Sequence, residues 1–118
     1  MNTPLEVATI AARALDAKKA EEISVLEVGN LTVMSEYFVI CNGTSTTHLK
    51  TLSEAVQKAL EDAGEKIDHI EGRNGGTWIL LDFGCTVVHI FMKEIREFYS
   101  LDRLWSDAKK VEIEGLEA

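Results

Sequence analysis

Proline and cysteine are nearly absent from the chain. Its 118 residues include one proline and two cysteines, so we expect neither a proline-rich linker nor a disulfide framework. Cys41 and Cys85 do not form a CxxC pair, and each lies in or beside an apolar segment. That setting is typical of a structural thiol. We therefore predict no disulfide and no metal site at these cysteines.

Long apolar runs are also missing. Runs such as residues 78–81 fall far short of the roughly 20 apolar residues that a membrane-spanning helix needs. The N-terminus lacks the basic start and the apolar stretch of a signal peptide. We therefore expect a cytoplasmic protein with no membrane partner.

Basic residues are outnumbered by acidic ones. Twelve lysines and arginines stand against twenty aspartates and glutamates, which gives a net charge of −8. An acidic protein gains little from counterion release on nucleic acid, so we do not expect it to recognise nucleic acid directly. Complementary charge speeds encounter with a basic protein surface, and a protein of that kind is the more plausible large partner.

Local signals predict two long helices. Thr3-Pro4 followed by Glu6 forms a capping box with proline at the first helical position, and the helix should continue to about residue 19. A second helix is expected over residues 46–63, because Gly64 suits the left-handed position just past a helix end.

The strands are predicted from short apolar, β-branched segments. They are expected at residues 23–28, 37–41, 67–71, 77–82 and 85–92, and a short helix at 93–100. The segment 37–41 is apolar on both faces and should be a central strand. The fold class is therefore α/β, with one domain over residues 1–108 and a mixed sheet of about five strands flanked by helices. Residues 109–118 are expected to form a charged tail that frays.

The last two strands should form a hairpin around Phe83-Gly84. A two-residue loop there would place Trp78 opposite His89. Side chains alternate along a strand, so one face of the hairpin should carry Trp78, Leu80, Asp82, Val87, His89 and Phe91. The opposite face is purely apolar and should form core beneath the helices. The Trp78 side mixes polar and apolar groups, and we expect it to be partly exposed.

The segment Gly43-Thr44-Ser45 follows a strand and precedes a helix, which is the general setting of a phosphate site. It lacks the lysine of a P-loop. Glu54 is the one acid in residues 43–60, whereas a nucleotidyltransferase needs a pair of carboxylates for its metal ions. We therefore interpret Gly43 as permitting a turn and Thr44 or Ser45 as capping the helix. His48, His69 and His89 show no metal-binding spacing, and we predict no enzyme activity and no cofactor.

Four segments together resemble one known family. They are YFVICNGTSTTHLKTLSEAV, HIEG, WILLDFGCTVVHIF and REFYSLDRLWSDA. In this order and spacing they resemble the ribosomal silencing factor, or Iojap-like, family. The resemblance implies a small α/β domain related to nucleotidyltransferases but without their catalytic acids.

The resemblance also implies a function. Members of the family bind the large ribosomal subunit through its ribosomal protein L14, on the face where the small subunit docks. They thereby block subunit joining and lower translation when nutrients are short. Organellar relatives act in assembly of the large subunit, and several members form homodimers. Two alternatives stay open, a divergent nucleotidyltransferase and a large-subunit assembly factor.

Matching the motifs position by position gives candidate contact residues. Trp78 is the first choice, and Leu80 shares its predicted face. Tyr99 and Trp105 match the closing aromatic positions and could serve either the core or the contact. The remaining matches are Glu71, Asp82, His89 and Leu104. Cys85 stands where many relatives carry Asp, so a salt bridge at that position is not expected.

Overall fold

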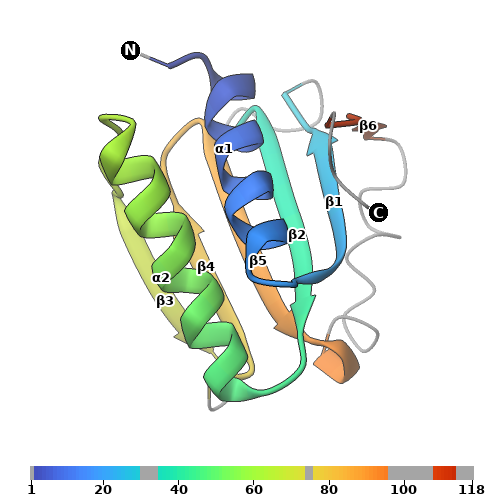
Figure 1. The fold of residues 1–118 in the computed structure, drawn as a ribbon. Helices are drawn as coiled ribbons and strands as arrows, with labels where there is room; N and C mark the ends of the chain where they lie inside the picture. The colour runs from blue at the N-terminus through green and yellow to red at the C-terminus, as the bar shows by residue number, and fades with distance from the viewer. Residues whose placement is uncertain (1, 30–34, 74–75, 96–107, 114–118) are drawn as a thin grey trace.

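Two helices lie on one face of a mixed six-stranded sheet (Figure 1). The computed structural model describes residues 2–29, 35–73, 76–95 and 108–113. The helices are α1 (Pro4–Ala17) and α2 (Thr46–Asp62). The strands are β1 (Glu21–Glu27), β2 (Tyr37–Gly43), β3 (His69–Arg73), β4 (Trp78–Asp82), β5 (Thr86–Met92) and β6 (Lys109–Lys110).

The strand order is β3-β4-β5-β2-β1-β6. β2 and β5 run parallel, whereas the other neighbours pair antiparallel. As predicted, β2 is central and covered on both sides. Val39 and Cys41 belong to the core beneath the helices, and Ile40 belongs to a second apolar cluster on the far face.

Local signals place the start of α1 correctly. The Thr3 hydroxyl accepts a hydrogen bond from the Glu6 amide, and the Glu6 carboxylate accepts one from the Thr3 amide. Hydrogen bonding of the exposed Glu6 carboxyl to the Thr3 backbone amide, and secondarily to the Thr3 side chain, lowers its pKa. The buried stripe of the helix consists of Val7, Ala8, Ala11, Ala12 and Leu15. The stripe begins at Val7, and the apolar side chain of Leu5, which precedes it, is 41% exposed.

The hairpin between β4 and β5 has a longer loop than predicted. Trp78 pairs with Phe91 rather than with His89, and Asp82 pairs with Val87. The reason is local. The Asp82 carboxylate accepts a hydrogen bond from the Gly84 amide at 2.7 Å, and Gly84 adopts a φ of +82°, which favours glycine. The register is thus shifted by two residues, and an even shift leaves every side chain on its predicted face.

A sixth strand was missed. Lys109 and Lys110, expected in the fraying tail, pair with Glu27 and Leu26 of β1. Val111 donates an amide hydrogen bond to the Val25 carbonyl at 2.8 Å. The alternation in Lys-Val-Glu-Ile, residues 110–113, was the available sequence signal, since Val111 and Ile113 pack against the core beneath the helices.

Two further expectations concern the helix predicted after β5 and the absence of a membrane-spanning helix. Of the helix predicted over residues 93–100, the structure describes the first three residues, which are helical. Within the described ranges, no helix combines the length and the apolar character needed to cross a bilayer.

Candidate protein-binding face of the sheet

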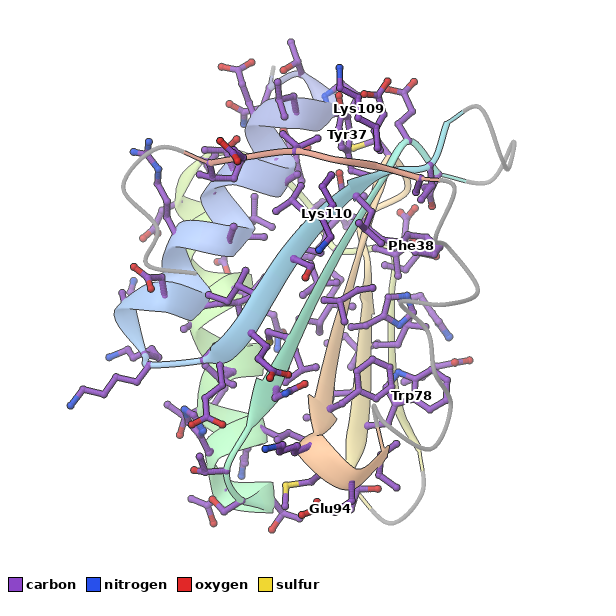
Figure 2. All side chains as sticks on the ribbon, turned by 90° about the vertical axis from the view of Figure 1, so that its right-hand side faces the viewer. Tyr37, Phe38, Trp78, Glu94, Lys109 and Lys110 are labelled. Carbon is purple, nitrogen blue, oxygen red and sulfur yellow. The ribbon has the colours of Figure 1, made fainter. Side chains whose placement is uncertain are left out.

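The sheet face turned away from the helices carries the main candidate site. Neighbours in a strand register point to the same side of a sheet, so the pairings of β2, β3, β4 and β5 define one surface. We call it the Trp78 face. It includes Phe38, Ile40, Asn42, His69, Glu71, Trp78, Leu80, Asp82, Val87, His89 and Phe91. In Figure 2, Phe38 and Trp78 project from the sheet on the side opposite the two helices.

Four rings pack together on this face. The ring centroids of Trp78 and Phe91 lie 4.8 Å apart. The ring of Phe38 packs edge-on against that of His89, with 5.0 Å between their centroids. The rings of His89 and Phe91 are nearly parallel, at 7° and 5.9 Å. Such contacts add stability beyond the area they bury. Trp78 is therefore held by a fixed aromatic support.

A hydrogen bond also orients the Trp78 indole. Its Nε1–H donates to Nδ1 of His89 at 3.4 Å. Since Nδ1 accepts, the proton of the neutral imidazole resides on Nε2. His89 is only 7% exposed, so it lies beneath Trp78 and steadies it.

Burial separates the predicted contact residues into two groups. Phe91, Val87 and His89 are buried, so the partial exposure expected of this face is confined to its other residues. Trp78, Leu80, Asp82 and Glu71 keep partial exposure. The face is therefore a second small core with a half-exposed strip, which consists of Trp78, Leu80 and Asp82 on β4 and Glu71 on β3.

The two acids of the strip differ in what they bind. The Glu71 carboxylate lies 2.9 Å from Nε2 of His69 on the same edge strand. Asp82 uses one carboxylate oxygen to hold the Gly84 amide and so shapes the hairpin loop. Five of the eight predicted contact residues are thus brought onto one face, while Tyr99, Leu104 and Trp105 lie outside the described residues.

Phe38 was not among the sequence-based candidates, although it supports the same cluster. The pattern YFVIC shows that its strand is buried on both sides but not which face each residue takes. The assignment of Phe38 to the Trp78 face depends on its parallel pairing with Val87, which no local sequence signal predicts.

The Gly43-Thr44-Ser45 segment is a helix cap. The Ser45 hydroxyl accepts from the His48 amide at 3.0 Å. The Thr44 amide donates to Nδ1 of His48 at 2.9 Å, and Nε2 of that ring donates to the Lys18 carbonyl at 2.8 Å. The Thr44 and His48 amides are therefore already bonded within the chain, and His48 ties the end of α1 to the start of α2.

Gly43 serves close packing rather than a turn. It is the last residue of β2, and an added Cβ would lie 2.5 Å from Cδ1 of buried Leu49. The predicted reason for this glycine was therefore wrong. α2 crosses the strand end so closely that Leu49 would have to move to make room for a side chain at this position.

Ser45→Ala tests the cap directly. Loss of an N-cap hydroxyl should lower the free energy of unfolding by about 1 kcal/mol, measured by urea denaturation. Thr47→Ala is the matched control, because Thr47 is an exposed hydroxyl residue in the first turn of the same helix. Equal effects of the two substitutions would contradict Ser45 as the capping residue.

Potential metal ligands and the two cysteines are the remaining reactive groups. In the part of the chain that the structure describes, no three His, Cys, Asp or Glu side chains come close enough to hold a metal ion. Cys41 and Cys85 are free thiols, Cys41 buried and Cys85 half-buried.

Comparison with known proteins agrees with this fold and identifies a family. A family model described as "Ribosomal silencing factor during starvation" matches residues 1–118. The ribosomal silencing factor of Halalkalibacterium halodurans is 35% identical over 111 residues, covering 94% of this chain and 95% of that one. The corresponding protein of Bacillus subtilis is 33% identical over 105 residues and covers 89% of each chain.

An organellar protein and a solved structure extend the comparison. The mouse protein named "Mitochondrial assembly of ribosomal large subunit protein 1" is 35% identical over 95 residues, which cover 78% of this chain and 42% of that one. The crystal structure of a Chromobacterium violaceum protein superposes with a TM-score of 0.86 at 30% identity, covering 96% of this chain and 93% of the other. The chain therefore belongs to the ribosomal silencing factor family.

Proposed function

We propose that this protein binds the large ribosomal subunit through ribosomal protein L14 and sterically prevents association with the small subunit. Translation would thereby be repressed when nutrients are limiting. This mechanism needs neither catalysis nor a cofactor. Family membership supports a ribosome-related role in the cytoplasm.

The observation that carries the proposal is the half-exposed strip. Trp78 and Leu80 present apolar surface, while buried Phe91 and His89 hold the Trp78 ring from beneath. A large aromatic side chain whose position is fixed before binding loses little conformational entropy in a complex. Residues of this kind are the usual anchors of protein interfaces.

Charge supports the choice of a basic protein partner. The chain carries a net charge of −8. Within the strip, Glu71 and Asp82 lie beside the apolar side chains of Trp78 and Leu80. Ribosomal proteins are generally basic. Acidic surroundings speed the encounter with such a surface and disfavour wrong partners, whereas the apolar anchors supply affinity.

Sedimentation with separated ribosomal subunits tests the proposal. We expect the protein to co-sediment with the large subunit and not with the small one. Adding the small subunit should then give fewer joined ribosomes than in a protein-free control. Binding to neither subunit, or binding without a decrease in joining, would contradict the proposed mechanism.

An assembly role is the second candidate, and the name of the mouse relative favours it. Cells depleted of the protein would then accumulate precursors of the large subunit, which gradient profiles would reveal.

A nucleotidyltransferase activity has less support, because the cap already engages the Thr44 and His48 amides. Nucleotide binding in the presence of Mg²⁺, measured by calorimetry, would support that activity. Homodimerisation, implied by the resemblance, is tested by analytical ultracentrifugation.

A further inference from the structure

The two edges of the sheet are built differently. At one edge, β6 is two residues long and both are lysines. Short strands and lysines are devices that keep sheet edges from pairing with other chains. At the other edge, β3 is five residues long and follows β4 in unbroken register. Its sequence, HIEGR, contains neither lysine nor proline.

Two residues of β3 favour close approach by another strand. Ile70 is 46% exposed and, among the described residues, is one of two large hydrophobic side chains that are exposed. An added Cβ at Gly72 would meet nothing within 4 Å. Within the described residues no strand pairs with the outer side of β3, which ends the sheet in Figure 1. An edge of this length and regularity is suited to pairing with an added strand.

The β3 edge is continuous with the Trp78 face. Glu71 pairs with Leu80 in the β3–β4 register. A strand added to β3 would therefore extend the sheet beside the half-exposed strip. One partner could contact the strip with its side chains and the edge with its backbone.

Charge indicates which kind of strand would bind. Residues 58–82, which run from the end of α2 through β3 and β4, contain six acidic and three basic residues. β3 itself carries one acid and one base, Glu71 and Arg73, so the excess negative charge lies in the segments around the edge. A basic segment is attracted to these surroundings more strongly than a second copy of the same net-acidic region.

We propose that the outer edge of β3 binds an extended, basic segment of the partner protein as a seventh strand of the sheet. The inference rests on the proposed function, because the partner is taken to be the large-subunit protein that contacts the Trp78 face. Backbone hydrogen bonds would supply part of the affinity, and contact with Ile70 would contribute to specificity.

Ile70→Lys tests the proposal, with Leu5→Lys as the matched control. Both positions are exposed leucine or isoleucine side chains, at 46% and 41%, and both substitutions add one positive charge. Leu5 lies on α1, which packs over β1 and β2 rather than over β3. Ile70→Lys should weaken binding to isolated large subunits by about tenfold or more, whereas Leu5→Lys should bind like the wild type. Circular dichroism checks that both variants fold.

Hydrogen exchange on the wild-type protein gives an independent measurement. Backbone amides of β3 should become protected when large subunits are added, because an added strand pairs with the outer row of the edge. This measurement stands even if Ile70→Lys does not fold.

Three outcomes would overturn a proposal, and they are distinguishable. If the wild type binds the large subunit, but Ile70→Lys binds equally well and β3 gains no protection, the edge proposal is wrong and the proposed function stands. If the wild type does not bind the subunit, the proposed function itself fails. If ultracentrifugation shows a dimer that Ile70→Lys dissociates while subunit binding is unchanged, the edge pairs with a second copy instead.

Discussion

Phe91→Ala should lower the free energy of unfolding by about 3–5 kcal/mol, the range for truncating a fully buried phenylalanine. Phe91 has no exposed surface, and its ring contacts those of Trp78 and His89. Its side chain belongs to the cluster on the face opposite the helices. Truncation would leave a cavity there, and the surrounding rings could fill it only by losing their present packing.

Equilibrium urea unfolding measures this effect. Leu5→Ala is the control, because Leu5 is 41% exposed and surface substitutions usually change stability by no more than about 0.5 kcal/mol. A loss for Phe91→Ala as small as that of the control would show that the Trp78 face does not act as a second core.

Trp78→Ala should weaken binding to the large subunit by about 2 kcal/mol or more, which is roughly a thirtyfold rise in Kd. Trp78 is half-exposed and is the largest side chain on the strip. Its orientation is fixed by the Phe91 ring at 4.8 Å and by the hydrogen bond to His89. The wild type therefore presents an ordered anchor that alanine cannot replace.

Affinity for separated subunits is the measurement, after circular dichroism has confirmed that the variant is folded. Trp78→Phe should fall between wild type and alanine, because it keeps a ring over Phe91 but loses the Nε1–H donor to His89. An unchanged Kd for Trp78→Ala in a folded protein would remove Trp78 from the binding face. The assignment of Leu80 and Glu71 would then also lose its main support.

Local chemistry determined much of this fold. The capping box at Thr3 and Glu6 and the serine cap at Ser45 use atoms within a few residues of one another, so the sequence predicts them well. The left-handed residue after α2 is likewise local, with Gly64 at a φ of +86°. Alternation along β4 and β5 assigned every side chain of that hairpin to its correct face.

Contacts between distant residues decided what the sequence left open. The burial of His89 depends on packing against Phe38, which is far away in sequence. Gly43 is favoured because α2 crosses the end of β2 closely. Periodicity says which side chains share a face but not which strand lies beside them or what covers them. The sequence by itself therefore determined the two long helices, the first five strands, the faces of the hairpin and the family resemblance. The tertiary structure decided which predicted contacts are buried supports, and which strands of the described sheet, β3 and β6, form its two edges.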